Sequence, residues 1–94
     1  MGSWSIERKL RKNAARLRSL RDELRVLDEQ LPYVSDDASD AELRALVSER
    51  PLGGEPREAR EHADAMTKHR ARMVAEICDL EQRQDDLLDR MNTR

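Results

Sequence analysis

The side chains best suited to ligate a metal ion are two histidines, His62 and His69, with Glu58 one helical turn before the first. Imidazole and carboxylate groups are common ligands of zinc and other transition metals. A helix separates residues seven positions apart by about 10 Å along its axis, whereas helical metal motifs place two histidines closer in sequence. The spacing therefore predicts solvated histidines, no metal site and no bound cofactor.

Four acidic residues close together in the sequence form a second candidate site: Asp36, Asp37, Asp40 and Glu42. One interpretation is an acidic tip that holds Mg²⁺, but the residue pattern of a cation-binding loop is absent. The interpretation that we favour places these carboxylates at a helix start, where negative charge stabilises the positive end of the helix dipole. Asp36, Asp37 and Asp40 are also candidates for contact with a protein partner.

Residues 7–21 are strongly basic, with seven Lys or Arg side chains and one acid. Arginine predominates, and it suits bidentate contacts to phosphate. However, aromatic residues are not interleaved with the basic ones, and no DNA- or RNA-binding motif is present. We therefore expect the stretch mainly to pair with an acidic helix. Trp4, Arg8, Arg11 and Arg18 are the candidates for partner contact, Trp4 either as a packed residue or as an exposed anchor.

Nucleophilic catalysis finds no support in the sequence. The single cysteine, Cys78, has no His near it in sequence, and the serines lack the flanking residues of a hydrolase motif. We expect that the protein is not an enzyme. A lone cysteine fits a reducing compartment, and neither a signal peptide nor an apolar run of the ~20 residues that span a bilayer is present. These features predict a cytoplasmic protein.

Two long helices, over residues 5–31 and 56–92, are predicted to carry these side chains. In both segments apolar residues recur with alternating spacings of three and four, which is typical of a coiled-coil seam. The first seam consists of Ile6, Leu10, Asn13, Leu17, Leu20, Leu24, Leu27 and Leu31. The second consists of Ala59, Ala63, Met66, Arg70, Met73, Ile77, Leu80, Gln84, Leu87 and Met91.

The segment between the two helices, residues 32–55, is predicted to hold a loop and a short third helix. Pro32 is expected to end the first helix, because the residue before a proline is disfavoured in helical geometry. Ser39 and Glu42 have the spacing of a capping box, which satisfies free N–H groups at a helix start. The short helix then runs to about Glu49, and Pro51 and the glycines after it close it.

Charge predicts that the two long helices pair in an antiparallel direction. The basic residues 7–21 then lie beside residues 76–90, which carry six acids and two bases. A parallel pair would instead bring the basic residues beside residues 57–72, which are also net positive.

Three polar seam residues, Asn13, Gln84 and Arg70, are predicted to set the register. If Asn13 faces Gln84, almost every other layer of the seam is apolar. In this register Arg70 enters the seam, and its guanidinium can reach outward to Glu23 or Asp28. A buried polar side chain in a seam costs stability but selects one register.

The fold class that follows is all-α: an antiparallel two-helix coiled-coil hairpin with a short third helix capping the loop end. It forms a single domain over residues 1–94. The short helix is expected to cover the first turns of the long helix with Leu43, Leu46 and Val47. Because a two-helix seam buries little area, two chains could also dimerise into a four-helix bundle.

Residues 58–64, with the sequence E-A-R-E-H-A-D, resemble the E-A-R-E-H-G-D stretch of the Gre transcript-cleavage factors. In that family the stretch belongs to the tip of a coiled coil that enters the secondary channel of RNA polymerase. The family has a second acid three residues after the Asp, where this chain has Thr67. Because of this difference, the cleavage activity of the family is not expected of this chain.

The sequence thus predicts a non-enzymatic interaction or regulatory protein whose hairpin presents a charged surface to a protein partner. The alternative is a regulator associated with the transcription machinery or with nucleic acid, acting through residues 8–21 or the acidic residues of 36–42. A homodimer is compatible with both interpretations. No contact with a membrane is expected.

Overall fold

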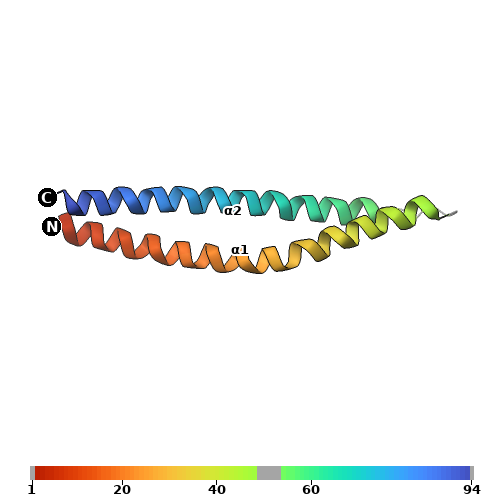
Figure 1. Cartoon of the computed structure of the whole chain (residues 1–94), viewed down its shortest axis with the longest axis horizontal. Helices are drawn as coiled ribbons and strands as arrows, with labels where there is room; N and C mark the ends of the chain where they lie inside the picture. Colours follow the sequence, from red (N-terminus) through yellow and green to blue (C-terminus); the bar gives the residue numbers. More distant parts are fainter. Residues whose placement is uncertain (1, 49–53, 94) are drawn as a thin grey trace. The chain divides into compact units, whose positions relative to one another are not determined.

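Two long helices make up the computed structural model, which describes residues 2–48 and 54–93. Helix α1 runs Gly2–Val47 and helix α2 runs Glu55–Asn92 (Figure 1). The described residues contain no strand. The all-α prediction is confirmed, and α2 agrees closely with the helix predicted over residues 56–92.

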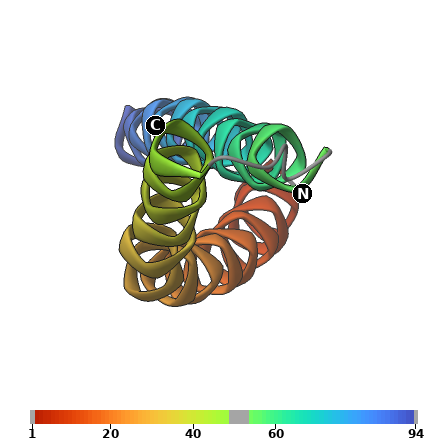
Figure 2. The ribbon, with the colours of Figure 1, turned by 90° about the vertical axis from the view of Figure 1, so that its right-hand side faces the viewer.

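Helix α1 does not end at Pro32 but continues to Val47. Figure 2 shows its ribbon passing from orange into green without a break. The prediction of a loop after Pro32 and of a separate third helix is therefore wrong. The predicted helix end at Pro51 lies outside the described residues.

The heptad seam explains why α1 passes through a proline. The spacing of three and four continues beyond Leu31 with Val34, Ala38 and Ala41, and both alanines are buried. A proline inside a helix costs about 3 kcal/mol, because it removes one backbone hydrogen bond and its ring crowds the preceding turn. Packing of the continued seam offsets this cost.

The chain forms two compact units, each made of one part of α1 and one part of α2. Unit 1 contains the residues up to Leu24 together with those from Arg72 onward. Unit 2 contains the residues from Arg25 to Ala71.

Ion pairs between the helices show the predicted antiparallel direction in unit 2. As the residue number rises along α1, the number of the partner falls along α2. The pairs are Asp28 with Arg70, Glu42 with Arg60, and Arg44 with Glu55.

The two units bury different side chains. Unit 1 buries large aliphatic residues, namely Ile6, Leu17, Leu20, Met73, Ile77 and Leu87. Unit 2 buries the small residues Ala38, Ala41 and Ala63. Because alanine removes less apolar surface from water than leucine or isoleucine, unit 1 gains more hydrophobic stabilisation per buried residue.

Candidate functional site

Exposed side chains along α1 in unit 2 combine acidic and apolar groups on one side of the helix. We name this surface the acidic-apolar face; it consists of Tyr33, Asp36, Asp40, Leu43, Leu46 and Val47. Spacings of three and four residues place these side chains on adjoining helix positions. Leu43, Leu46 and Val47 expose 58%, 83% and 74% of their surface. Such exposure of three neighbouring apolar side chains is typical of an interaction surface.

The prediction that Leu43, Leu46 and Val47 cover the first turns of α2 is wrong. That prediction assumed a separate helix, which could adopt any rotation about its own axis and so pack Leu43 and Leu46 against α2. Because α1 is continuous, its register instead turns Ala38 and Ala41 inward. The three larger side chains are thereby left on the exposed side.

The acidic residues Asp36, Asp37 and Asp40 are all exposed and lie inside α1. Their favoured interpretation as helix-start charges is therefore wrong, because no helix starts there. Among the described residues they have no hydrogen-bond or ion-pair partner, and no three His, Cys, Asp or Glu side chains could together hold a metal ion. Their charge thus faces solvent.

Ser39 and Glu42, predicted as a capping box, instead contact Arg60 of α2. The Arg60 guanidinium donates hydrogen bonds to both Glu42 carboxylate oxygens, at 2.6 and 3.2 Å, and to the Ser39 hydroxyl at 3.2 Å. The hydrogen bond from Arg60 holds the pKa of Glu42 below its ordinary value of 4.5. Through these bonds Arg60 joins the two helices of unit 2. It belongs to residues 58–64, the stretch that resembles the Gre tip.

Asn13 and Arg70, two of the three residues predicted to set the register, each bond the opposite helix. The buried Asn13 side chain donates a 2.8 Å hydrogen bond to the Leu80 carbonyl, one turn before Gln84. Its pairing with the Gln84 side chain stays a prediction. Arg70 donates a 2.5 Å hydrogen bond to Asp28, one of the two carboxylates expected for it. This bond raises the pKa of Arg70.

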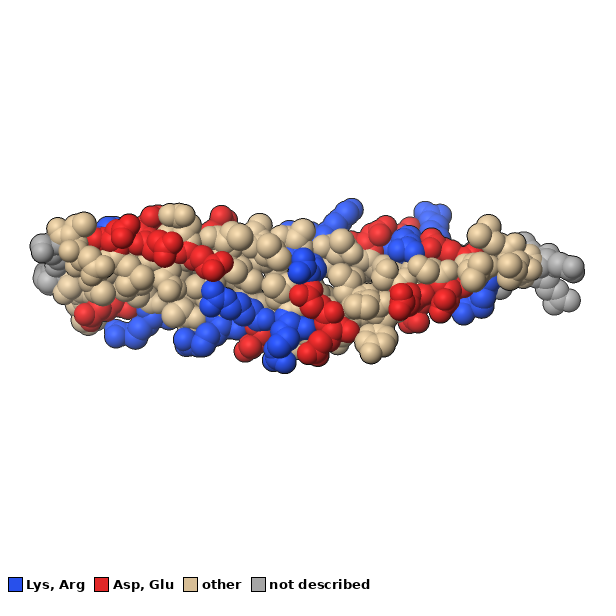
Figure 3. Space-filling view, viewed as in Figure 1, with Lys and Arg blue, Asp and Glu red and all other residues tan. Residues whose placement is uncertain are grey.

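Only part of the basic stretch pairs with the acidic segment of α2 in unit 1. Lys and Arg gather over the α1 part of unit 1, opposite a band of Asp and Glu along α2 (Figure 3). Arg16 bonds Glu76 at 2.8 Å and Arg21 bonds Glu81 at 3.3 Å. The remaining basic side chains of the stretch have no carboxylate partner among the described residues.

Trp4 stays 62% exposed, with the Arg8 guanidinium 5.8 Å from the centre of its ring. This distance is that of a cation–π contact. Arg11 and Arg18 are exposed further along α1. Their exposure leaves all four residues accessible to a partner.

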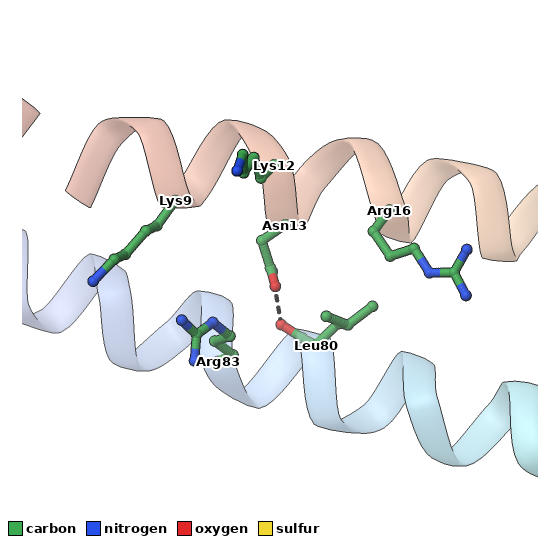
Figure 4. A pocket seen from close by; sticks show the side chains of 6 residues that line it. All are labelled: Lys9, Lys12, Asn13, Arg16, Leu80 and Arg83. Atoms are coloured by element: carbon green, nitrogen blue, oxygen red, sulfur yellow. Dashed lines mark hydrogen bonds between the residues drawn. The ribbon is translucent and has the colours of Figure 1, made fainter. Parts of the chain in front are cut away.

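A surface pocket of about 250 Å³ lies between α1 and α2 in unit 1. We name it the basic pocket; it is lined by Lys9, Lys12, Asn13, Arg16, Leu80 and Arg83. In Figure 4 the Lys9 side chain extends from α1 toward α2, whereas the Lys12 side chain stays close to α1 and the Arg83 side chain lies close to α2. The Arg16 guanidinium points away along the helix.

Sequence reasoning missed three residues of this pocket, Lys9, Lys12 and Arg83. A signal was present, because the predicted register places Arg83 beside Asn13, inside the basic stretch. Arg83 is one of only two bases in the acidic residues 76–90, so the net charge of that segment hides it.

The other chemically reactive residues make no site in the described part of the chain. His62 and His69 are exposed along α2, and Cys78 is an exposed free thiol. No helix among the described residues is long and apolar enough to cross a lipid bilayer. No family model, curated protein or solved structure matches the chain. The acidic-apolar face and the basic pocket are therefore the candidate sites of the described residues.

Proposed function

We propose that this chain is a non-enzymatic cytoplasmic interaction protein that binds a protein partner through the acidic-apolar face. One observation carries the proposal: Leu43, Leu46 and Val47 are exposed, whereas the buried positions of unit 2 are occupied by alanines. Internal packing does not bury these apolar side chains. Their burial by a partner would therefore stabilise the complex.

Charge indicates the chemistry of that partner. Residues 25–71 carry 11 acidic and 7 basic side chains, and Asp36 and Asp40 lie beside the exposed apolar residues. A surface with Lys or Arg side chains around an apolar centre would complement both features. We therefore expect a basic partner whose association slows as salt is added.

The test compares the wild-type chain with Leu43→Glu/Leu46→Glu and with the control Val26→Glu. Val26 is also an exposed apolar residue of α1 in unit 2, so the control adds the same kind of charge outside the face. We expect a basic protein to be captured from the native cell by the wild type and the control but not by the double variant. The captured protein, once purified, should bind the wild-type chain directly, with at least tenfold weaker binding to the double variant.

Light scattering on the isolated protein tests whether the acidic-apolar face instead binds a second copy of the chain. A wild-type dimer that the double variant dissociates would assign the face to a second copy of the chain and overturn the proposal of a basic partner. Equal capture by all three chains would also contradict it. Circular dichroism of each variant checks that the helices remain intact, as expected for exposed positions.

A second candidate function, a regulator that binds nucleic acid, is favoured by the unpaired exposed side chains of Arg11 and Arg18. If it is correct, DNA or RNA binding is tight, falls steeply with salt and is lost in Arg11→Glu/Arg18→Glu. The leading proposal expects only nonspecific binding, with Kd no tighter than ~10⁻⁴ to 10⁻⁶ M at physiological salt.

A further inference from the structure

We propose that the basic pocket binds the terminal phosphate group of a small molecule. This inference goes beyond the proposed partner binding, because it concerns unit 1 and a different ligand. It starts from the position of four cationic side chains, from both helices, around one pocket of about 250 Å³.

Three of the four cations are available to a ligand. Arg16 is committed to Glu76 through hydrogen bonds of 2.8 and 3.2 Å, and it points away from the pocket. Lys9, Lys12 and Arg83 have no ion-pair partner among the described residues. They bring a positive charge each and many N–H donors, which phosphate oxygens accept.

The lining of the pocket contains no acid that would repel an anion. Besides the cations it consists of Asn13 and Leu80, which are joined by the 2.8 Å hydrogen bond from the Asn13 amide to the Leu80 carbonyl. This bond fixes the Asn13 side chain beneath the charged residues. Gathering like charges without a counterion is unfavourable, so an anion placed among them stabilises the helix pair of unit 1.

Carboxylates just outside the pocket limit the affinity. Asp79 and Asp86 lie about one turn to either side of Arg83 on α2, and Asp86 accepts a hydrogen bond from Gln82. Because the cations are exposed and these acids are near, we expect a Kd on the order of 1 mM for inorganic phosphate.

The arrangement suits a compact phosphate end better than a nucleic-acid backbone. A backbone presents one negative charge after another along a line and is bound by cations in a row. Arg11 and Arg18, which would extend such a row along α1, do not line the pocket. A terminal phosphate carries up to two charges at a single point, which matches one pocket lined by Lys9, Lys12 and Arg83.

The test is an NMR titration with inorganic phosphate and pyrophosphate at constant ionic strength. We expect saturable shift changes at Lys9, Lys12 and Arg83, with tighter binding of pyrophosphate. Lys12→Glu and Arg83→Glu should each weaken binding at least tenfold. The matched control Arg18→Glu, which reverses a charge on the same unit outside the pocket, should change Kd less than twofold.

Three outcomes would overturn the proposal. The first is the absence of saturable shifts at constant ionic strength. The second is an equal loss in Arg18→Glu, which would indicate nonspecific charge attraction. The third is a short DNA strand that binds tighter than pyrophosphate and shifts Arg11 and Arg18 as well. Arg83→Gln, which removes the charge without adding an acid, keeps the test decisive if a Glu variant unfolds.

Discussion

Asn13 occupies a seam position where every neighbour in the heptad pattern of its helix is apolar. Its amide bonds the Leu80 carbonyl, which also accepts the backbone N–H of Gln84 within α2. Removing the Asn13 amide therefore leaves no buried acceptor unsatisfied. The sequence suggested Gln84 as the partner of Asn13, and the observed acceptor lies one turn earlier, at Leu80. Every residue has a backbone carbonyl, so residue types cannot predict which carbonyl accepts the bond.

We predict that Asn13→Leu raises the free energy of unfolding by about 1 kcal/mol, since it replaces a polar group by an apolar one in the seam. Asn13→Ala should lower it, because the smaller side chain leaves a cavity. Urea unfolding followed by circular dichroism measures both. A Leu variant less stable than the wild type would show that the Asn13 hydrogen bond stabilises the fold more than an apolar side chain does.

Glu76 and Glu42 are each held by an arginine across the helix pair. The hydrogen bond from Arg16 lowers the pKa of Glu76, and that from Arg60 lowers the pKa of Glu42. A carboxyl whose folded pKa lies below its unfolded value stabilises the fold fully above the unfolded value. That stabilisation is lost as the pH falls through the folded pKa.

A carbon-13 NMR titration should therefore give midpoints below the ordinary 4.5 for both carboxyls. Arg16→Gln should return the Glu76 midpoint upward and leave that of Glu42 in place, and Arg60→Gln should do the reverse. Arg18→Gln is the control that should move neither. A Glu76 midpoint unchanged in Arg16→Gln would mean that the ion pair does not form in solution.

Helix α1 shows how a local rule and a long-range pattern can disagree. Pro32 is locally a stop signal, and Ser39 with Glu42 is locally a start signal. The heptad spacing nevertheless continues through both positions, with Val34, Ala38 and Ala41 as seam residues. Packing decides the outcome, because burial along the whole pair outweighs one lost backbone bond. Alanines also carry a weak apolar signal, so the more hydrophobic Leu43, Leu46 and Val47 were mistaken for the packed side.

The continuity of α1 predicts that Pro32→Ala stabilises the protein. The alanine regains the backbone hydrogen bond to the carbonyl four residues earlier, at Asp28, and we expect a gain of about 2 kcal/mol in the free energy of unfolding. Pro56→Ala is the matched control: Pro56 lies in the first turn of α2, where a proline loses no hydrogen bond, so its replacement should be neutral or slightly destabilising. No gain in Pro32→Ala would argue for a helix end at that residue.

The chain as a whole combines two kinds of helix pair. Unit 1 has a core of large aliphatic side chains and a basic pocket, whereas unit 2 has a core of alanines and an exposed acidic-apolar face. The helical class, α2 and the antiparallel direction followed from periodicity and charge. Neither the acidic-apolar face nor the basic pocket did, because each depends on which side chains stay exposed once the seam is filled. Each helix pair is expected to form within one chain, because the ion pairs between the helices join α1 to the α2 of the same chain.

Crosslinking of cysteine pairs tests that expectation most directly. In a Cys78→Ser background, Arg16→Cys/Glu76→Cys reports on unit 1 and Asp28→Cys/Arg70→Cys on unit 2, at positions joined by ion pairs. The mismatched control Asp28→Cys/Glu61→Cys places its cysteines out of register. With a short bis-maleimide at low protein concentration, we predict rapid crosslinking of the first two pairs within single chains and little for the control. Crosslinks mainly between chains, or a control as fast as the ion-paired positions, would contradict the account.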